Sequence, residues 1–188
     1  MPMPVRFIET ELDGVLVVES GRAADDRGFF SEVYSERTWA EQGFRERFVQ
    51  DNLSMSHKGV VRGMHYQLEP HAMGKLVRAV RGAVYDVAVD LRRGSPTFGK
   101  WVGVELNESG NTALWIPAGF AHGFLALEDH TLVYYKSTAV HTPEAERTLS
   151  YQCPRVGICW PIPPKIISRK DAEAPGLDEA EFNFRYRG

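Results

Sequence analysis

The chain has 188 residues, of which 43% are hydrophobic and 25% charged, and its formal net charge is -3 at pH 7. A chain of this size and balance forms one globular domain with a sizeable core, and its charge gives it no general attraction to nucleic acid. Because it contains no apolar run long enough to span a bilayer and no signal-peptide core within residues 1–11, we expect a cytoplasmic protein that binds neither membrane nor nucleic acid.

Most of the chain is predicted to form short strands separated by turns. Residues 28–34 follow a polar turn, and Gly82 separates two strands rich in valine and alanine. Along the second of these, side chains at alternate positions share one face, and that face carries Val84, Asp86, Ala88 and Asp90. The strand candidates, in chain order, are residues 14–19, 28–34, 48–54, 59–67, 75–81, 83–91, 101–106, 112–116, 123–127 and 131–137.

Two short helices complete the prediction. Residues 36–42 are predicted to form a helix that ends at Gly43. A second helix is predicted to begin at Ser168, where Asp171 completes a capping pair. About ten strands at short, regular spacing favour an all-β barrel or sandwich. We expect a single domain over residues 1–188.

The segment 115–124 carries a Pro-x-Gly-x-x-His pattern formed by Pro117, Gly119 and His122. It resembles the second motif of the cupin superfamily, in which the histidine points into a jelly-roll β-barrel. Metal-binding cupins have a His-x-His pair in their first motif, but here the corresponding strand has His65 followed by Gln67. Two histidines are too few for an ordinary zinc or iron site. We therefore expect no metal, which leaves an imidazole free to act as a base near neutral pH.

His65 has two cations nearby. Arg62 is three positions away, and Lys75 lies on the next strand candidate. A lone histidine on a strand is more often a core residue, but two cations beside it are costly in an apolar core and suit an anionic ligand. The polar strip at 50–52 is equally compatible with a solvated edge and with a binding wall. Tyr134 and Tyr135 occupy opposite faces of their strand, so one of them can deliver a proton.

Five long motifs make the chain similar to one enzyme family. They are DDRGFF at 25–30, FVQDNLSMSHKGVVRGMHYQ at 48–67, GKLVRAVRGAVYDVAVDLRRGSPTFG at 74–99, WIPAGFAHGF at 115–124 and ISRKDAEAPGL at 167–177. Together they resemble the dTDP-4-dehydrorhamnose 3,5-epimerase family. The resemblance implies a cupin-type jelly-roll β-barrel with short flanking helices. It also implies an enzyme that inverts carbons 3 and 5 of dTDP-4-dehydro-6-deoxy-D-glucose through an enolate, without a cofactor.

The resemblance further implies roles for individual residues. His65 is the expected base and Asp171 orients it. Tyr135 is the expected acid on the opposite face of the sugar, and Lys75 stabilises the enolate oxygen. The diphosphate and the sugar are expected to contact Arg27, Arg62 and His122, and the nucleotide site is expected to comprise Glu32, Gln50, Asp51, Asn52, Glu146 and Lys170.

The resemblance also implies an assembly. The family forms homodimers in which an N-terminal strand crosses to the partner, so Arg27, Phe30 and Glu32 are expected to serve the neighbouring subunit's site. One stretch departs from the family pattern. Where the family has Tyr-Tyr-Ser-Pro, this chain has Val-His-Thr-Pro at 140–143, which alters an aromatic contact to the nucleotide base.

Three other functions remain open from the sequence. A relative that inverts only carbon 3 of the dTDP-linked 4-keto-6-deoxy sugar would carry the same catalytic residues. A sugar-binding cupin without activity would not need His65, Lys75, Tyr135 and Asp171 together. A metal-dependent cupin oxygenase or isomerase would need a metal, which an assay detects.

Overall fold

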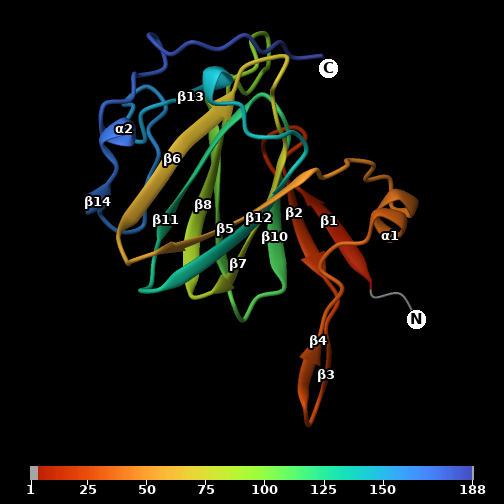
Figure 1. The fold of residues 1–188 in the computed structure, drawn as a ribbon. Coiled ribbons are helices and arrows are strands. Elements are labelled where there is room, and N and C mark those ends of the chain that lie inside the picture. The colour runs from red at the N-terminus through yellow and green to blue at the C-terminus, as the bar shows by residue number, and fades with distance from the viewer. Residues whose placement is uncertain (1–3, 188) are drawn as a thin grey trace.

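Two antiparallel sheets face each other across a shared core (Figure 1). The computed structural model describes residues 4–187. The first sheet has the strand order β1 (Val5–Glu9), β2 (Leu16–Ser20), β10 (Thr112–Ile116), β7 (Lys75–Arg81), β12 (Thr131–Ser137) and β5 (Gln50–Ser56). The second has the order β13 (Glu146–Thr148), β6 (Val60–Gln67), β11 (Phe120–Ala126), β8 (Ala83–Asp90) and β9 (Trp101–Asn107), with β14 (Ile166–Ile167) parallel to β6. The predicted all-β jelly-roll barrel is confirmed.

The core lies between the sheets because alternate residues of each strand point inward. Val77 and Leu114 from the first sheet meet Val84, Ala88 and Phe120 from the second in one buried cluster. A second apolar layer covers the outer face of the second sheet and is built largely from the chain after residue 149. A third covers part of the first sheet beneath α1 (Glu36–Glu41). Both faces of β8 are therefore buried, which explains its nearly continuous apolar sequence.

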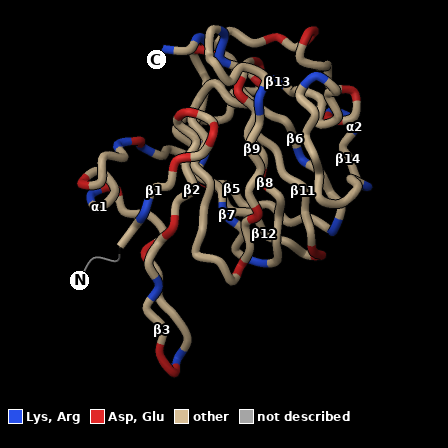
Figure 2. The backbone as a smooth tube through the Cα atoms, turned by 180° about the vertical axis from the view of Figure 1, so that it is seen from behind, with Lys and Arg blue, Asp and Glu red and all other residues tan. Residues whose placement is uncertain are grey.

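The segment 28–34 differs from its prediction as a single strand. Only β4 (Gly28–Phe30) is extended, and it pairs with β3 (Ala23–Asp25) in a hairpin that projects away from the barrel (Figure 1). The tip of this hairpin carries charges of both signs (Figure 2). All six residues of β3 and β4 are exposed, so the hairpin buries little of its surface against the rest of residues 4–187.

Several other boundaries also differ. β11 begins at Phe120 rather than at residue 123, because pairing with β8 starts where Gly119 ends the preceding turn. Sequence reasoning missed β1, β3, β13 and β14, of which β3 and β13 are only three residues long and β14 two. The two predicted helices are confirmed as α1, capped by Ser35, and as α2 (Arg169–Ala172), capped by Ser168. A 3-10 turn, η1 (Pro143–Ala145), precedes β13.

Between residues 4 and 187, no helix is long and apolar enough to cross a membrane. The predicted domain of residues 1–188 includes 1–3 and 188, which lie outside the described residues, and it stays a prediction.

Two glycines allow β6 and β11 to approach closely at the level of the site. Gly63 has φ of 132°, a conformation that residues with a side chain rarely adopt. A Cβ there would lie 2.5 Å from the Cα of Gly123 and 2.9 Å from the carbonyl oxygen of His122. The register between the two strands shifts at this point, between His122 and Phe124. The glycine pair thus sets the separation of the strands that carry His65 and His122.

We predict that Gly63→Ala destabilises the protein by about 2–5 kcal/mol, because backbone strain and overpacking add. For a chain of this size that corresponds to a Tm lowered by roughly 5–20 °C, measured by thermal denaturation. Gly94→Ala is the matched control, because Gly94 also has a positive φ but a Cβ there meets nothing within 4 Å. An equal loss in both variants would contradict the close-packing explanation.

Candidate active site

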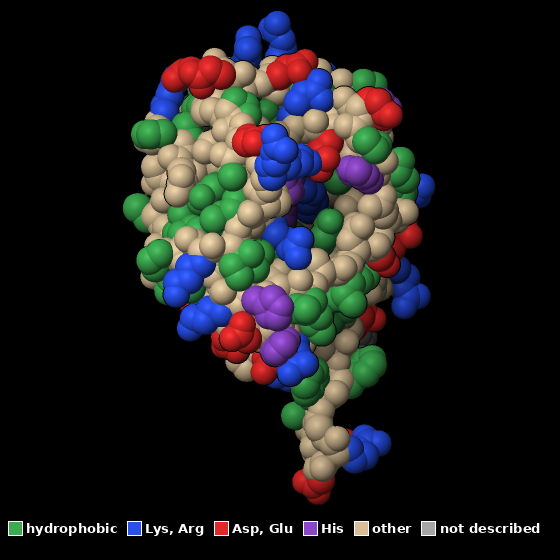
Figure 3. Space-filling model, turned by 60° about the vertical axis from the view of Figure 1, so that its left-hand side comes forward, with side chains coloured by type: hydrophobic (Ala, Val, Ile, Leu, Met, Phe, Trp, Pro, Cys, Tyr) green, Lys and Arg blue, Asp and Glu red, His purple; other side chains and the backbone are tan. Residues whose placement is uncertain are grey.

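The four predicted catalytic side chains, and His122, which is predicted to contact the substrate, converge on a cavity lined by both sheets. His65 enters from β6, Lys75 from β7, His122 from β11 and Tyr135 from β12, while Asp171 enters from α2. The cavity measures about 500 Å³, and all five residues line it. Figure 3 shows its mouth, with histidine and cationic side chains visible inside the hollow. Four strands of two sheets thus hold the groups that the sequence placed far apart.

His65 is paired with Asp171. Its Nε2 lies 2.6 Å from Oδ1 of Asp171, whose side chain is only 4% exposed, whereas that of His65 is 30% exposed and open to the cavity. Burial alone raises the pKa of Asp171. Its hydrogen bonds with His65, with the Gly63 backbone and with Ser168 outweigh burial and hold this pKa below its usual range. The carboxylate therefore stays ionised and fixes the orientation of the ring.

Lys75 is half-buried, and the cavity is its route to solvent. Burial lowers its pKa to about 8, opposed by the negative charges of Asp86 and Glu146. Its Nζ lies 6.0 Å from the ring centre of Tyr135. Burial likewise raises the pKa of Tyr135, so its hydroxyl keeps its proton at neutral pH. The site thus holds a cation of moderate acidity next to a protonated phenol.

His122 is buried and bonded to a carboxylate that the sequence analysis did not include in the site. Its Nε2 lies 2.8 Å from Oδ1 of Asp86, which is fully buried. Burial lowers the pKa of His122, although Asp86 opposes this. The ring is therefore neutral near pH 7. A sequence signal for Asp86 existed, because it is a carboxylate on an inward face between Val84 and Ala88.

A smaller cavity of about 290 Å³ adjoins the first and shares His65, Lys75 and Tyr135 as lining residues. Its other polar lining residues include Gln50, Asn52 and Glu146, three of the residues that the sequence analysis assigns to a nucleotide site. Lys170 reaches this region through an ion pair with Glu146, with Nζ and Oε2 2.5 Å apart.

Gln67, which stands where a metal-binding cupin has its second histidine, lines the smaller cavity and supports a loop. Its amide donates to the carbonyl oxygen of His71 at 2.7 Å and accepts from the backbone N–H of Thr142 at 2.7 Å. The loop so held carries His141, whose backbone N–H donates to Gln50 at 2.9 Å and whose exposed ring faces Glu146. His141 thus occupies the rim of the cavity at the point where the chain departs from the family pattern.

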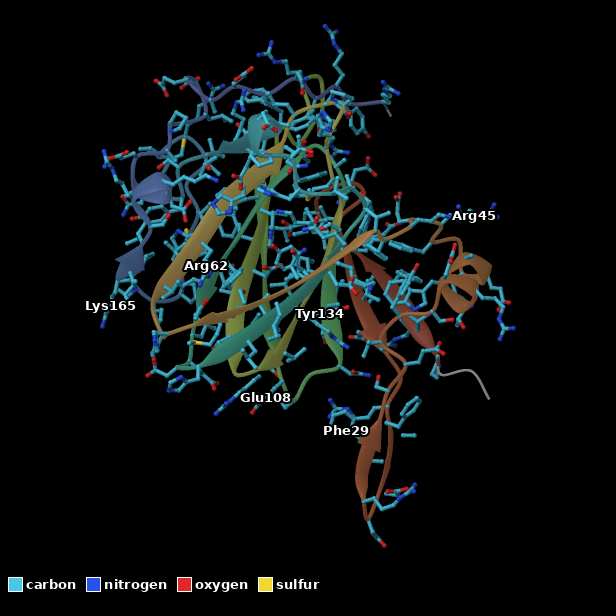
Figure 4. All side chains as sticks on the ribbon, viewed as in Figure 1. Phe29, Arg45, Arg62, Glu108, Tyr134 and Lys165 are labelled. Atoms are coloured by element: carbon cyan, nitrogen blue, oxygen red, sulfur yellow. The ribbon has the colours of Figure 1, made fainter. Side chains whose placement is uncertain are left out.

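Arg62 also lines the larger cavity, and Figure 4 shows its position on β6 beside β5. It donates from Nε to Ser56 at 3.0 Å and from Nη2 to the carbonyl oxygen of Met55 at 3.0 Å. These bonds fix the guanidinium at the edge of the hollow. Sequence reasoning did not include several further lining residues, namely Ser54, Phe124, Ile166, Ile167 and Ser168.

Four predicted site residues lie away from the cavities of this subunit. Asp51 lies on the outer face of β5, where its Oδ1 accepts a hydrogen bond from Lys136 at 2.7 Å, because the alternation of the strand turns Gln50 and Asn52 inward instead. Arg27 and Phe30 lie on the projecting hairpin, where Arg27 pairs with Asp25. Glu32 is half-buried beyond this hairpin and lines neither cavity.

The chain matches known proteins over nearly its whole length. The family model described as dTDP-4-dehydrorhamnose 3,5-epimerase matches residues 9–179. The dTDP-4-dehydrorhamnose 3,5-epimerase of Methanothermobacter thermautotrophicus is 48% identical over 177 residues, which are 93% of this chain and 95% of that protein.

Solved structures give the same result. The dTDP-6-deoxy-D-glucose-3,5-epimerase of Legionella pneumophila, in complex with dTDP-4-keto-L-rhamnose, has a TM-score of 0.92 at 42% identity and matches over 98% of this chain and 100% of its own. A 3'-monoepimerase from Streptomyces bikiniensis, in complex with dTDP-quinovose, has a TM-score of 0.84 at 35% identity, over 90% of this chain and 86% of its own. The cupin-type fold and the family predicted from the motifs are confirmed, and the chain belongs to the dTDP-4-dehydrorhamnose 3,5-epimerase family.

Proposed function

We propose that this protein inverts carbons 3 and 5 of dTDP-4-dehydro-6-deoxy-D-glucose to give dTDP-4-dehydro-L-rhamnose. The observation that carries the proposal is the convergence of an oriented histidine, a half-buried lysine and a protonated tyrosine on the wall shared by two cavities. A keto sugar needs this set of groups for inversion: a base, a cation for the enolate and an acid. A single inversion at carbon 3 is the alternative outcome of the same experiment.

The proposed reaction moves only protons. The ring nitrogen of His65 that does not face Asp171 removes the proton from carbon 3 or carbon 5, both of which the carbon 4 keto group acidifies. The electron pair of that C–H bond becomes the enolate, whose oxygen lies against the Lys75 ammonium. The Tyr135 hydroxyl then delivers a proton to the opposite face, which inverts the carbon. Exchange with water returns a proton to Tyr135 and removes the one held by His65.

The larger cavity suits the sugar and diphosphate, and the smaller one suits the nucleotide. Arg62 can donate a pair of hydrogen bonds to phosphate oxygens. The nitrogen of the Asn52 amide is buried without a partner, so it is available to a carbonyl group of the base. Because the reaction transfers neither electrons nor hydride, we propose that it needs no redox cofactor and no metal.

We further propose that the protein is a homodimer in which the hairpin of one subunit completes the site of the other. Phe29 and Phe30 are 61% and 68% exposed on a hairpin that extends into solvent (Figure 4). Leu53 and Met55 are 64% and 46% exposed on the outer face of β5. Exposed apolar side chains on each of these two surfaces are typical of contact surfaces. Arg27 would then reach the partner's diphosphate, with Phe30, Glu32 and Asp51 at the same junction.

We predict that wild-type protein incubated with this substrate in deuterated water incorporates deuterium at carbons 3 and 5. His65→Ala should lower exchange at both carbons by about 10²–10⁴-fold, because it removes the base. Mass spectrometry and NMR measure the label. His57→Ala, at an exposed histidine outside both cavities, is the control and should exchange normally. Exchange at the wild-type rate in His65→Ala would contradict the proposed base, and label at carbon 3 alone would establish the single inversion.

We predict that Tyr135→Phe separates exchange from inversion. His65 can still form the enolate and return a deuteron to the original face, so label should enter with little inverted product. Tyr134→Phe is the control, since that hydroxyl lies on the outer face of β12 beside Lys136. Normal yields of inverted product from Tyr135→Phe would assign the acid to another residue.

A further inference from the structure

A carboxylate behind the cavity wall touches two residues of the proposed mechanism without reaching the ligand space. Asp86 lies on β8 with 0% exposure, and it is absent from the lining of both cavities. Its Oδ1 accepts the hydrogen bond from Nε2 of His122, while its Oδ2 has no hydrogen-bond partner among residues 4–187. A buried charge with one bond and an apolar surrounding is unfavourable unless a counter-charge compensates it.

Lys75 lines the same cavity as His122 and is the cation that we assign as the counter-charge of Asp86. Among the charged groups around this lysine, Asp86 acts most strongly to keep the ammonium protonated against its burial. Lys75 comes from the first sheet, whereas Asp86 and His122 come from the second, and the side chains of Lys75 and His122 line the same cavity. The other groups facing Lys75 are His65 on β6, Tyr135 on β12, Glu146 on β13 and Lys170 on α2. Asp86 differs from these groups because it is fully buried and also bonds to His122, a second residue of the cavity.

We propose that Asp86 is a positioning residue that keeps two cavity residues in their working states, Lys75 as a cation and His122 as a neutral ring of one tautomer. The inference rests on the proposed function. With its Nε2–H donated to Asp86, the neutral ring of His122 can only accept a hydrogen bond at its other nitrogen. Such a ring selects a hydroxyl of the sugar rather than the keto oxygen. The keto oxygen is thereby left to the Lys75 ammonium, where the enolate charge develops.

The sign of the pH dependence follows from the charge of Asp86. Enolate stabilisation needs protonated Lys75, so activity should fall as pH rises through the pKa of about 8. Removing the negative charge of Asp86 lowers that pKa further. The alkaline decline of kcat/KM should therefore move to lower pH by about one unit or more in Asp86→Asn. For a shift of one unit, the loss of activity relative to wild type should then be about fivefold greater at pH 8 than at pH 6, and about tenfold greater at pH 10.

The experiment compares kcat/KM from pH 6 to pH 10 in the wild-type protein, Asp86→Asn and Asp86→Glu. Asp86→Glu keeps the charge and should keep the wild-type alkaline decline even where its rate is lower. Asp90→Asn is the matched control, because Asp90 is equally buried on the same face of β8 but bonds to Arg92 and Ser95 outside the cavity. It should lose stability and keep the wild-type pH profile. Asp86→Ser replaces the asparagine variant if that protein does not fold.

The outcomes separate the inference from the function on which it rests. Wild-type protein without exchange or inversion would refute the proposed function. If the wild-type protein is active and the folded Asp86→Asn variant has the same pH profile as the wild type, the inference about Asp86 is wrong and the proposed function stands. A uniform loss at every pH, equal to that in Asp90→Asn, would also overturn it, because it would show a structural effect only.

Discussion

The hydrogen bond between His65 and Asp171 is the interaction on which the rest of the site depends. It joins residues 106 positions apart and connects the second sheet to the C-terminal segment. Ser168 caps α2 and holds the backbone of Asp171, and β14 places α2 by pairing with β6 in parallel. Because the Asp171 carboxylate is buried, water does not compete for this hydrogen bond, and the bond holds the His65 ring in one orientation. The C-terminal segment therefore acts as part of the catalytic wall as well as a cover for the sheet.

Carboxylates placed next to the lysines of the site offset the free energy that burying these cations costs. Asp86 lies behind Lys75, and Glu146 lies between Lys75 and Lys170. Each carboxylate reduces the cost of holding a cation in a space of low polarity, but none neutralises Lys75 by a direct hydrogen bond in the described structure. Such a cation is free to bind a negative charge that appears during the reaction. A preorganised cation of this kind stabilises an enolate more than a solvated lysine could.

Most strands and much of the site could be predicted from the sequence, because hydrophobic periodicity indicates the strands and long motifs indicate the site residues. β7, β10 and β12 have the bounds that alternation predicted, and His65, Lys75, Tyr135 and Asp171 converge as the motifs implied. The errors have a common physical cause. Segment 28–34 and the short strands β13 and β14 depend on surfaces supplied from elsewhere, which local pattern does not encode.

Asp51 and Asp86 show the limits of reading side chains one at a time. Both are aspartates on predicted strands, yet one faces solvent on an edge strand and the other faces the interior of the barrel. Alternation alone gives two faces and does not say which is inward. On β8 the apolar residues Val84 and Ala88 identify the inward face. On β5 both faces carry polar residues, so the sequence pattern does not identify which face is inward. The pairing of β5 with β12 in the folded protein determines which face of β5 is inward.

The most direct test of the account is the rate of deuterium incorporation in Asp171→Asn. The variant keeps the size of the side chain but loses the charge that orients His65, and thermal denaturation establishes that it is folded. The account predicts that exchange at both carbons falls by about 10²–10⁴-fold. Asp178→Asn, at an exposed carboxylate paired with Arg155, should exchange at the wild-type rate. Exchange at the wild-type rate in folded Asp171→Asn would contradict the claim that the buried carboxylate makes His65 the base.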